Sequence, residues 1–512
     1  MWTRTLGVAI LVLTACGSPT ASTSPVPRLP APAAPPQTWR PVAQMSPFTQ
    51  GAAQPFLLTD GTVMIQDLET PDFYRLTPDA SGSYANGAWS QLASLPDGYA
   101  PLYYASAVLP DGRVIAEGGE YDGGPMVWTT RGAIYDPIAN TWSALQPPTG
   151  WSSIGDASGM VLAGGVFLLS NCCTTDLALF DPNALTWSAW GKDKADINDE
   201  ESWVMLPDDT ILTVDTNNVD DLRESEILDP HTGIWSFAGD TPVKIDDTDA
   251  DGTGSHEVGP NVLRADGTVI AFGGNGHNAL FDPATKIWSA APDTPTRDNQ
   301  QLDLADAPAA LLPNGNVLLV ASPGVFGTPS YIFEWDGTQF DDVPQTPNCP
   351  IDTSYQFAML MLPTGELLMT DYTNDVEIYT PAPGVADAAI PQVLAVGEQG
   401  TTLRSGSEDA VIELYPGATF ELDGVQLSGI SQAGFYGDDV QTYTSYPLVR
   451  VTNAATGDVR YLRTHEHSSR SLVRGAEART LFDVPPDAEP GPSSLEVVVN
   501  GIASPAIAVD VK

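Results

Sequence analysis

The chain has 512 residues, enough for a large repeat array and a further module. Its 65 acidic residues outnumber 21 basic ones, and the formal net charge of −44 argues against nucleic-acid binding because such a surface repels phosphate. The 46 glycines, 45 prolines and short apolar runs separated by turn residues argue against a helical protein and indicate an all-β chain. This acidity fits either a highly soluble surface or a demand for cations such as Ca²⁺.

The N-terminal residues predict export and lipid anchoring. Arg4 precedes an apolar run, Leu6 to Leu13, that is too short to span a bilayer, so residues 1–15 are predicted to be a cleaved signal peptide. The signal ends Leu13-Thr14-Ala15-Cys16, which resembles the bacterial lipobox and implies acylation of Cys16; an ordinary signal with a chance cysteine is the alternative. Residues 16–36 are rich in Ser, Ala and Pro and suit a tether. We therefore expect a monomer in the bacterial cell envelope, held extracytoplasmically on the membrane by its lipid.

A strand–turn–strand unit recurs along residues 37–382. The spacing of its turns averages about fifty residues, the period of kelch repeats, and Asx-Gly pairs suit tight hairpins because these need positive φ. The seven turns are Asp60-Gly61, Asp111-Gly112, Ala163-Gly164-Gly165, Asp208-Asp209, Asp266-Gly267, Asn314-Gly315 and Thr364-Gly365. The repeat predicts a seven-bladed kelch-type β-propeller.

A second marker follows four of the hairpins: an Asp with a Trp six residues later. The copies are Asp136 and Trp142, Asp181 and Trp187, Asp229 and Trp235, and Asp282 and Trp288. We interpret each as the outer hairpin of a blade, with its Trp packed between neighbouring blades. The last repeat lacks that Trp, whereas Thr38-Trp39-Arg40 follows the tether, so the N-terminal strand is predicted to complete the last blade and close the ring.

The C-terminal residues predict a separate β module. A Pro- and Ala-rich linker, residues 383–391, precedes short alternating strands in residues 392–512. Examples are Val411 to Leu414, Leu448 to Val451 and Leu495 to Val499. Their number and length suit an immunoglobulin-like β-sandwich.

This order of modules resembles the galactose oxidase and glyoxal oxidase family over about residues 38–512. The C-terminal likeness lies in Gly437-Asp438-Asp439-Val440-Gln441, in Tyr446-Pro447-Leu448-Val449 and in Pro490-Gly491-Pro492 with Val499-Asn500-Gly501, which are similar to the family's "early set" domain. The resemblance implies the same fold and domain order.

The resemblance does not extend to the family's copper site. Tyr103 matches the Tyr that the family cross-links to a Cys, Tyr121 matches the stacking aromatic, and Tyr355 opens the last blade. The two histidine positions hold Gln356 and Gln441, and no Cys lies between Trp39 and Tyr103. Copper(II) prefers imidazole to a neutral amide, so we expect neither copper binding nor copper-radical oxidase activity.

Acidic residues occupy the starts of the predicted innermost strands, where side chains from different blades converge. They suit either a hard cation or acid–base chemistry, whereas solvated loop charges are the alternative. The candidate catalytic residues are Glu200, Glu201, His256, Glu257, Asp303 and Asp306. Asp438 and Asp439 are expected to reach this region from the C-terminal module.

The loop Asp247-Thr248-Asp249-Ala250-Asp251-Gly252 has the oxygen spacing of a Ca²⁺ loop. The match to an EF-hand is incomplete, because Val258 stands at the twelfth position. Asp247, Asp249 and Asp251 are therefore candidate calcium ligands, with a plain acidic loop as the alternative.

Three cysteines follow Cys16, and an oxidising compartment favours disulfides. Either Cys172 and the adjacent Cys173 close a vicinal disulfide, or one of them pairs with Cys349. An odd count leaves one thiol free in both cases.

Three functions remain open at this point. The first is a non-catalytic surface protein that binds a glycan or another envelope ligand at the propeller mouth, with Tyr103, Tyr104, Tyr121 and Trp128 stacking on sugar rings. The second is an enzyme of different chemistry at the acidic channel, such as a metal-assisted hydrolase or lyase. The third is a structural or assembly lipoprotein.

Overall fold

The computed structural model describes residues 37–217, 222–248, 254–401, 404–405 and 411–512. The signal peptide, Cys16, the tether, Asp249 and Asp251 lie outside these residues. These described residues form one compact unit. Of the helices in the described part, none has the length and apolar character needed to cross a membrane.

All seven predicted turns join the first strand of a sheet to the second. Asp60 forms the first of them: its Oδ1 accepts the backbone N–H of Thr62 at 3.0 Å, and Gly61 follows with φ of +76°. Asp111 accepts the N–H of Arg113 at 3.0 Å in the same way, and Gly112 has φ of +86°. The Asp supplies the hydrogen bond and the Gly tolerates the left-handed backbone, which explains why this pair recurs.

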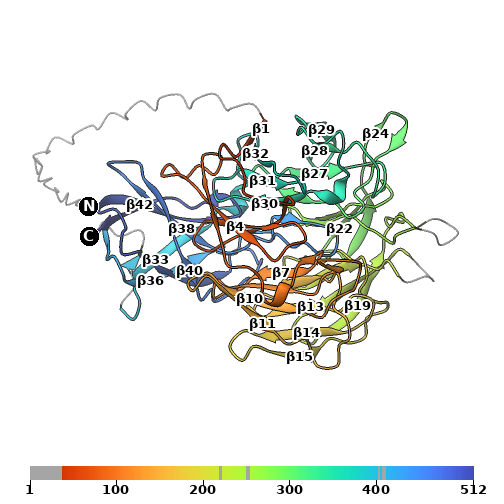
Figure 1. Cartoon of the computed structure of the whole chain (residues 1–512), viewed down its shortest axis with the longest axis horizontal. Coiled ribbons are helices and arrows are strands. Elements are labelled where there is room, and N and C mark those ends of the chain that lie inside the picture. The colour runs from red at the N-terminus through yellow and green to blue at the C-terminus, as the bar shows by residue number, and fades with distance from the viewer. Residues whose placement is uncertain (1–36, 218–221, 249–253, 402–403, 406–410) are drawn as a thin grey trace, which may run out of the picture. The chain divides into compact units, whose positions relative to one another are not determined.

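Within the described residues, seven sheets are four-stranded antiparallel meanders, and one of them gains a fifth strand, β37 (Gly434–Phe435). They are consistent with the blades of a propeller and run from red through green to blue-green in Figure 1. In chain order the sheets comprise β2 (Ala52–Leu57), β3 (Val63–Asp67), β4 (Phe73–Thr77) and β5 (Ala88–Gln91); β7 (Ala105–Val108), β8 (Val114–Glu117), β10 (Gly132–Asp136) and β11 (Thr141–Leu145); β12 (Gly159–Val161), β13 (Phe167–Ser170), β14 (Leu177–Asp181) and β15 (Thr186–Trp190); β16 (Val204–Met205), β17 (Ile211–Val214), β18 (Glu224–Asp229) and β19 (Ile234–Asp240); β20 (Asn261–Leu263), β21 (Val269–Ala271), β22 (Ala279–Asp282) and β23 (Ile287–Ala290); β26 (Ala309–Leu311), β27 (Val317–Ala321), β28 (Tyr331–Trp335) and β29 (Phe340–Asp342); and β30 (Ala358–Met361), β31 (Leu367–Thr370) and β32 (Val376–Thr380) with β1 (Thr38–Pro41).

Shorter elements connect these sheets. They are the strand pairs β6 (Pro101–Leu102) with β9 (Tyr121–Asp122) and β24 (Thr296–Arg297) with β25 (Gln300–Gln301), and the 3₁₀ helices η1 (Pro96–Gly98), η2 (Ser354–Gln356) and η3 (Asp387–Ala389).

The outer hairpins show why Asp and Trp recur at a fixed spacing. Asp136 ends β10, and its Oδ1 accepts the N–H of Ile138 at 2.8 Å, which forms the turn. Trp142 on β11 then donates its indole N–H to the carbonyl of Ala93, beyond the end of β5, at 3.1 Å. Trp288 likewise reaches the Ser225 hydroxyl on β18 at 2.9 Å. These two Trp residues therefore join neighbouring sheets, as predicted.

The N-terminal strand completes the last sheet. β1 pairs antiparallel with β32, and Trp39 lies opposite Tyr379. The Trp39 indole donates to the Pro344 carbonyl, beyond the end of β29, at 2.7 Å. On the other side of the last sheet, β30 contacts β2. The first and last repeats are thus joined through β1 and through the contact of β30 with β2.

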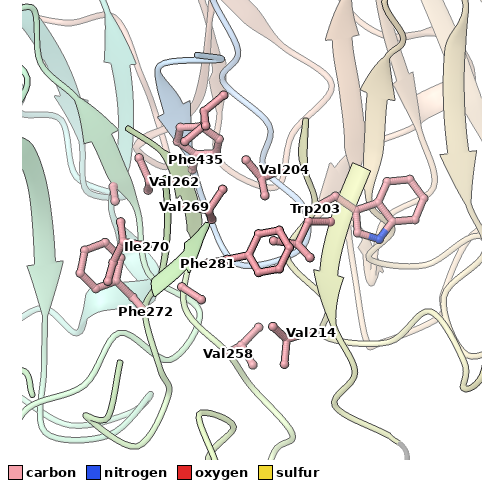
Figure 2. Packing of buried hydrophobic residues seen from close by; sticks show 14 of the residues in the cluster. Trp203, Val204, Val214, Val258, Val262, Val269, Ile270, Phe272, Phe281 and Phe435 are labelled. Atoms are coloured by element: carbon pink, nitrogen blue, oxygen red, sulfur yellow. The ribbon is translucent and has the colours of Figure 1, made fainter. Parts of the chain in front are cut away.

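Apolar side chains fill the space between the sheets. Figure 2 shows part of this core, which includes Val262, Ile270, Phe281 and Trp203. Phe435 from β37 belongs to the same buried cluster. Complete burial of one such side chain contributes roughly 1.5–3 kcal/mol. The C-terminal residues therefore share a core with the repeats.

The C-terminal residues form two further sheets, drawn in blue in Figure 1. One contains β33 (Gln392–Glu398), β34 (Arg404–Ser405), β36 (Thr419–Val425), β40 (Thr464–His465) and β41 (Glu477–Asp483). The other contains β35 (Ile412–Leu414), β38 (Leu448–Asn453), β39 (Val459–Leu462), β42 (Gly491–Val499), β43 (Ile502–Ala503) and β44 (Ile507–Val511). Phe420 stacks on Phe482 at 5.5 Å within their own apolar core.

Residues 431–442, here named the hub finger, connect this region to the repeats. Every residue of the finger is buried, and Phe435 pairs with Ala309 on β26. The finger is polar, yet its side chains bond backbone groups of the innermost strands: Gln432 Oε1 accepts the N–H of Met205 at 2.9 Å, and Thr442 donates to the Met359 carbonyl at 2.6 Å. The finger thereby satisfies groups that no neighbouring strand reaches.

Candidate functional site

The innermost strands all begin at one end of their sheets, here named the hub end. Tyr103, Asp156, Glu200 and Asp306 each precede such a strand, and Tyr355 lies in η2 just before β30. The candidates named from the sequence include Tyr103, Glu200, Asp306 and Tyr355 but not Asp156. The finger adds Asp438 and Asp439, as expected from the sequence.

Three carboxyl groups meet at the hub end, and we name them the hub triad: Asp306, Asp438 and Asp439. One oxygen from each lies within 4.8 Å of the others. Asp438 and Asp439 are 8% and 3% exposed. Asp438 Oδ1 accepts the N–H of Asp439 at 2.9 Å, whereas both oxygens of Asp439 and Oδ1 of Asp306 accept no hydrogen bond. Buried carboxylate oxygens without partners are rare and need an explanation.

The hub triad lies among further acidic groups. Burial, and then the charge of Asp156, raises the pKa of Asp306 to about 8. Burial and neighbouring carboxylates also raise the pKa of Asp438 and Asp439 well above the usual range. The pKa values of Glu200 and Glu257 are raised for the same reasons. Within the described ranges no Lys, Arg or His forms an ion pair with the triad, so its negative charge lacks a protein counter-charge.

The backbone at the hub end is strained. Val440 in the finger has φ of +40°, a left-handed conformation that is unfavourable for a β-branched residue. Such conformations persist only where the surrounding structure imposes them, and they concentrate at functional sites. Other residues in the left-handed conformation include Tyr103, Glu200, His256, Asp306, Tyr372 and, in the finger, Ala433.

Four rings, here named the aromatic row, follow one another at the hub end. Tyr121 meets Tyr103 at 6.2 Å, Tyr103 meets Tyr355 at 6.5 Å, and Tyr355 meets Phe326 at 5.9 Å between ring centroids. The three tyrosines are half-buried, and Phe326 is 78% exposed. Tyr436 of the finger donates to the Tyr355 carbonyl at 2.6 Å and so supports the row.

The positions that match the family's copper site separate into two groups. Tyr103, Tyr121 and Tyr355 lie together, but both glutamines are bonded elsewhere. Gln356 Oε1 accepts the N–H of Thr353 at 3.0 Å. Gln441 Oε1 accepts the N–H of Ser106 at 3.0 Å, and its amide donates to the Asp438 carbonyl at 2.7 Å. The donors that remain at these positions are phenols and carboxylates without an imidazole, and this set does not fit copper(II), which prefers imidazole ligands.

The candidate catalytic residues do not form a single group. Glu200, Glu257 and Asp306 lie together at the hub end, where each influences the pKa of another. His256 instead donates from Nδ1 to the Thr216 carbonyl at 3.1 Å. Asp303 accepts the backbone N–H groups of Ala305 and Gly324 at 3.3 and 2.8 Å. Glu201 turns away into another cluster.

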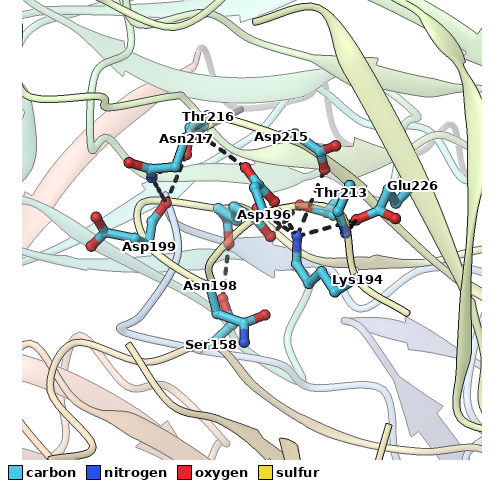
Figure 3. A network of polar contacts seen from close by, with 12 residues as sticks. Ser158, Lys194, Asp196, Asn198, Asp199, Thr213, Asp215, Thr216, Asn217 and Glu226 are labelled. Atoms are coloured by element: carbon cyan, nitrogen blue, oxygen red, sulfur yellow. Dashed lines mark hydrogen bonds and ion pairs between the residues drawn. The ribbon is translucent and has the colours of Figure 1, made fainter. Parts of the chain in front are cut away.

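That cluster, named the blade cluster, consists of Lys194, Asp196, Glu201, Asp215 and Glu226 (Figure 3). The Lys194 ammonium is fully buried, 2.6 Å from Asp196 and 2.8 Å from Glu201. Burial alone would lower the pKa of Lys194, but the surrounding carboxylates outweigh it and raise the pKa. Lys194 therefore stays charged and balances part of the acidic charge around it.

The structure forms neither predicted disulfide. All three described cysteines are free, although the Cys172 and Cys173 sulfurs lie 2.7 Å apart. Cys349 packs in an apolar cluster with residues of β30 and β31, next to the Thr346 hydroxyl at 3.2 Å. Cys172 follows β13 on a different sheet, so the fold separates it from Cys349.

Two further predicted residues have local roles. Asp247 accepts hydrogen bonds from the Ser255 hydroxyl at 2.7 Å and from the N–H of Glu257 at 3.1 Å, so it holds its own loop together. Tyr104 is 1% exposed and donates to Gln66 at 3.0 Å. The prediction that its ring stacks on a sugar is therefore wrong, because the ring is buried. Trp128 remains 41% exposed.

Comparison with known proteins gives structural likeness only. No protein-family model and no curated protein matches the sequence. The structure is similar to a fungal alcohol oxidase of the AA5 family in complex with copper, at 13% identity and a TM-score of 0.49, over 93% of this chain and 99% of that one. It is also similar to streptogramin B lyase (10% identity, TM-score 0.46, 67% of this chain and 97% of that one) and to YjhT (16% identity, TM-score 0.38, 59% and 100%). At these values none of the matches assigns an activity.

Proposed function

We propose that the chain is an exported, lipid-anchored protein of the bacterial envelope that binds a carbohydrate or a related envelope ligand at the hub end. We further propose a seven-bladed kelch-type propeller over residues 37–382 and an immunoglobulin-like sandwich over residues 392–512. The seven meander sheets and the pairing of β1 with β32 support the propeller. The two C-terminal sheets around one core support the sandwich.

The aromatic row carries the ligand proposal. Sugars present faces of C–H groups and rims of hydroxyl groups, so binding sites for them combine aromatic rings with fixed acceptors. Tyr103 and Tyr355 supply half-exposed rings, and Glu120, whose pKa burial raises to about 7, supplies an acceptor next to Tyr121. Exposed apolar side chains on the loop between β9 and β10, Met126 and Trp128 among them, extend this surface at the same end of the sheets.

Glycan-array binding followed by calorimetry tests the proposal. Tyr355→Ala and Phe326→Ala should each weaken binding of a glycan found on the array by about ten- to a hundredfold, because both remove stacking area. Phe237→Ala is the matched control, since Phe237 on β19 is 62% exposed away from the aromatic row. Absence of binding to any envelope glycan would favour a structural or assembly role, and binding that both variants retain would refute the role of the row.

Copper-radical oxidation is not part of the proposed function. The amides of Gln356 and Gln441 are committed to backbone groups, and no cysteine sulfur is among the partners of Tyr103 in the described residues. Copper loading of the purified protein should leave less than stoichiometric metal after dialysis and no peroxide release from primary alcohols. Stoichiometric copper with peroxide release would overturn this conclusion.

A metal-assisted hydrolase or lyase is the second candidate. The raised pKa values of Glu200 and Glu257 favour it, because general acid catalysis uses a carboxyl group whose pKa is raised by burial and by neighbouring carboxylates. The Glu200→Gln, Glu257→Gln double variant should then abolish turnover of a bound glycan. Binding without turnover by the native protein, or turnover that the double variant retains, would exclude this role.

A further inference from the structure

The hub triad is an unusual arrangement for a folded chain on its own. Three carboxyl groups from two distant segments lie close together, and Asp439 is 97% buried with neither oxygen hydrogen-bonded. A buried carboxylate normally has a cationic or hydrogen-bonding partner, because its desolvation is otherwise costly. The arrangement lacks a component that neutralises it.

We propose that the hub triad binds one hard divalent cation of the Ca²⁺ type between Asp306, Asp438 and Asp439. The oxygens lie within 4.8 Å of one another, which is no more than about twice a Ca²⁺–oxygen bond of 2.3–2.6 Å. A single ion between them therefore needs only small movements of the side chains.

The ligand chemistry selects the class of metal. All three ligands are carboxylates, which suit Ca²⁺, Mg²⁺ or Mn²⁺, whereas zinc and copper favour imidazole and thiolate. In the finger, the Gln441 amide donates to the Asp438 carbonyl and accepts the N–H of Ser106. Cys172 and Cys173 gather around Asp199 as a separate group. Ca²⁺ takes six to eight oxygen ligands, more than three carboxylates supply with one oxygen each, so water or a ligand hydroxyl completes the coordination.

A cation at this position would join the propeller to the C-terminal region. Asp306 precedes β26, whereas Asp438 and Asp439 belong to the hub finger, so the ion would cross-link residues more than a hundred positions apart. Binding of an ion by the folded chain alone stabilises the fold by mass action. The hub triad and the aromatic row share no residue, so the ion site is independent of the ligand that the row binds.

Thermal unfolding of the full chain tests the site. After EDTA treatment and dialysis, Ca²⁺ at about one hundred times its Kd should raise Tm by about 2–5 °C. The Asp438→Asn, Asp439→Asn double variant should lose this shift. Asp247→Asn is the control, because Asp247 belongs to the other loop with a calcium-like pattern and should leave the shift intact.

Terbium luminescence supplies a readout that does not depend on stability. Tb³⁺ replaces Ca²⁺ at oxygen sites, and tyrosines near the triad, Tyr436 among them, should sensitise its emission. Emission should fall at least tenfold in Asp439→Asn and remain in Asp247→Asn. The proposal is overturned if Ca²⁺, Mg²⁺ and Mn²⁺ all leave Tm unchanged, or if Asp247→Asn removes the shift and the emission while the triad variants keep them. A Tm shift with failed glycan binding would refute only the proposed ligand.

Discussion

The blade cluster and the hub triad contain the same kind of residue in opposite electrostatic settings. In the blade cluster, four buried or nearly buried carboxylates surround the Lys194 ammonium, which lies within 4.0 Å of each of them. In the hub triad, three carboxyl groups come equally close together with no ammonium or guanidinium paired to them among the described residues. The position of the positive charge, rather than the number of acids, therefore separates a structural cluster from one that is prepared for a ligand.

Removal of the internal cation should give the largest effect. Lys194→Met leaves the carboxylates of the blade cluster without their ammonium and should lower the free energy of unfolding by about 3–5 kcal/mol, measured by urea denaturation. The control is Lys244→Met, because Lys244 is half-exposed and its ammonium pairs with Asp246 at 3.0 Å. That change should cost less than about 1 kcal/mol. Equal effects of the two variants would show that Lys194 is not the organising charge.

The Asp303 carboxylate is intermediate between the blade cluster, which has an ammonium partner, and the hub triad, which has none among the described residues. Backbone N–H groups rather than a cation face it. Burial raises its pKa to about 7, so the folded protein holds this proton up to a higher pH than the unfolded chain. The contribution to stability is complete below about pH 4 and is lost as pH rises to 7. Between pH 4.5 and 7.5 in EDTA, the unfolding free energy of Asp303→Asn should fall by about 2–4 kcal/mol less than that of the unsubstituted protein. An unchanged pH dependence would contradict the assignment.

Replacement of a charged residue in the hub triad should raise the free energy of unfolding, whereas replacement of Lys194 in the blade cluster should lower it. Without divalent ions, Asp439→Asn removes an unpaired buried carboxyl and should raise the free energy of unfolding by about 1–2 kcal/mol. With saturating Ca²⁺ the unsubstituted protein should instead be more stable than Asp439→Asn, because only the unsubstituted protein binds and is stabilised by the ion. Urea denaturation with EDTA and with Ca²⁺ measures both. A loss of stability in EDTA would mean that the triad is a structural cluster like the one around Lys194.

The repeats were predictable because their signals are local. Asp60 and Gly61 form their turn with neighbours in sequence, and the spacing of Asp136 and Trp142 sets an outer hairpin by itself. The closure by Trp39 was predictable because one repeat lacked an element that another segment supplied.

Much of the candidate site depends on long-range packing that no local pattern reports. Ala309 pairs with Phe435, and Ser158 bonds both the Glu201 and the Asp438 carbonyls, over separations that the sequence does not mark. Asp156 is different: it stands nine residues before the end of its turn, as do Tyr103, Glu200 and Asp306, so alignment of the repeats would have placed it at the hub end.

The pairing of β1 with β32 has a consequence for biogenesis. Residues 38–41 are synthesised long before their partners, residues 377–380. The opening segment must therefore wait, unpaired, until most of the polypeptide has been made, and contacts between such distant positions form slowly. A protein built this way depends on protection from proteases and from premature association while its chain is still growing.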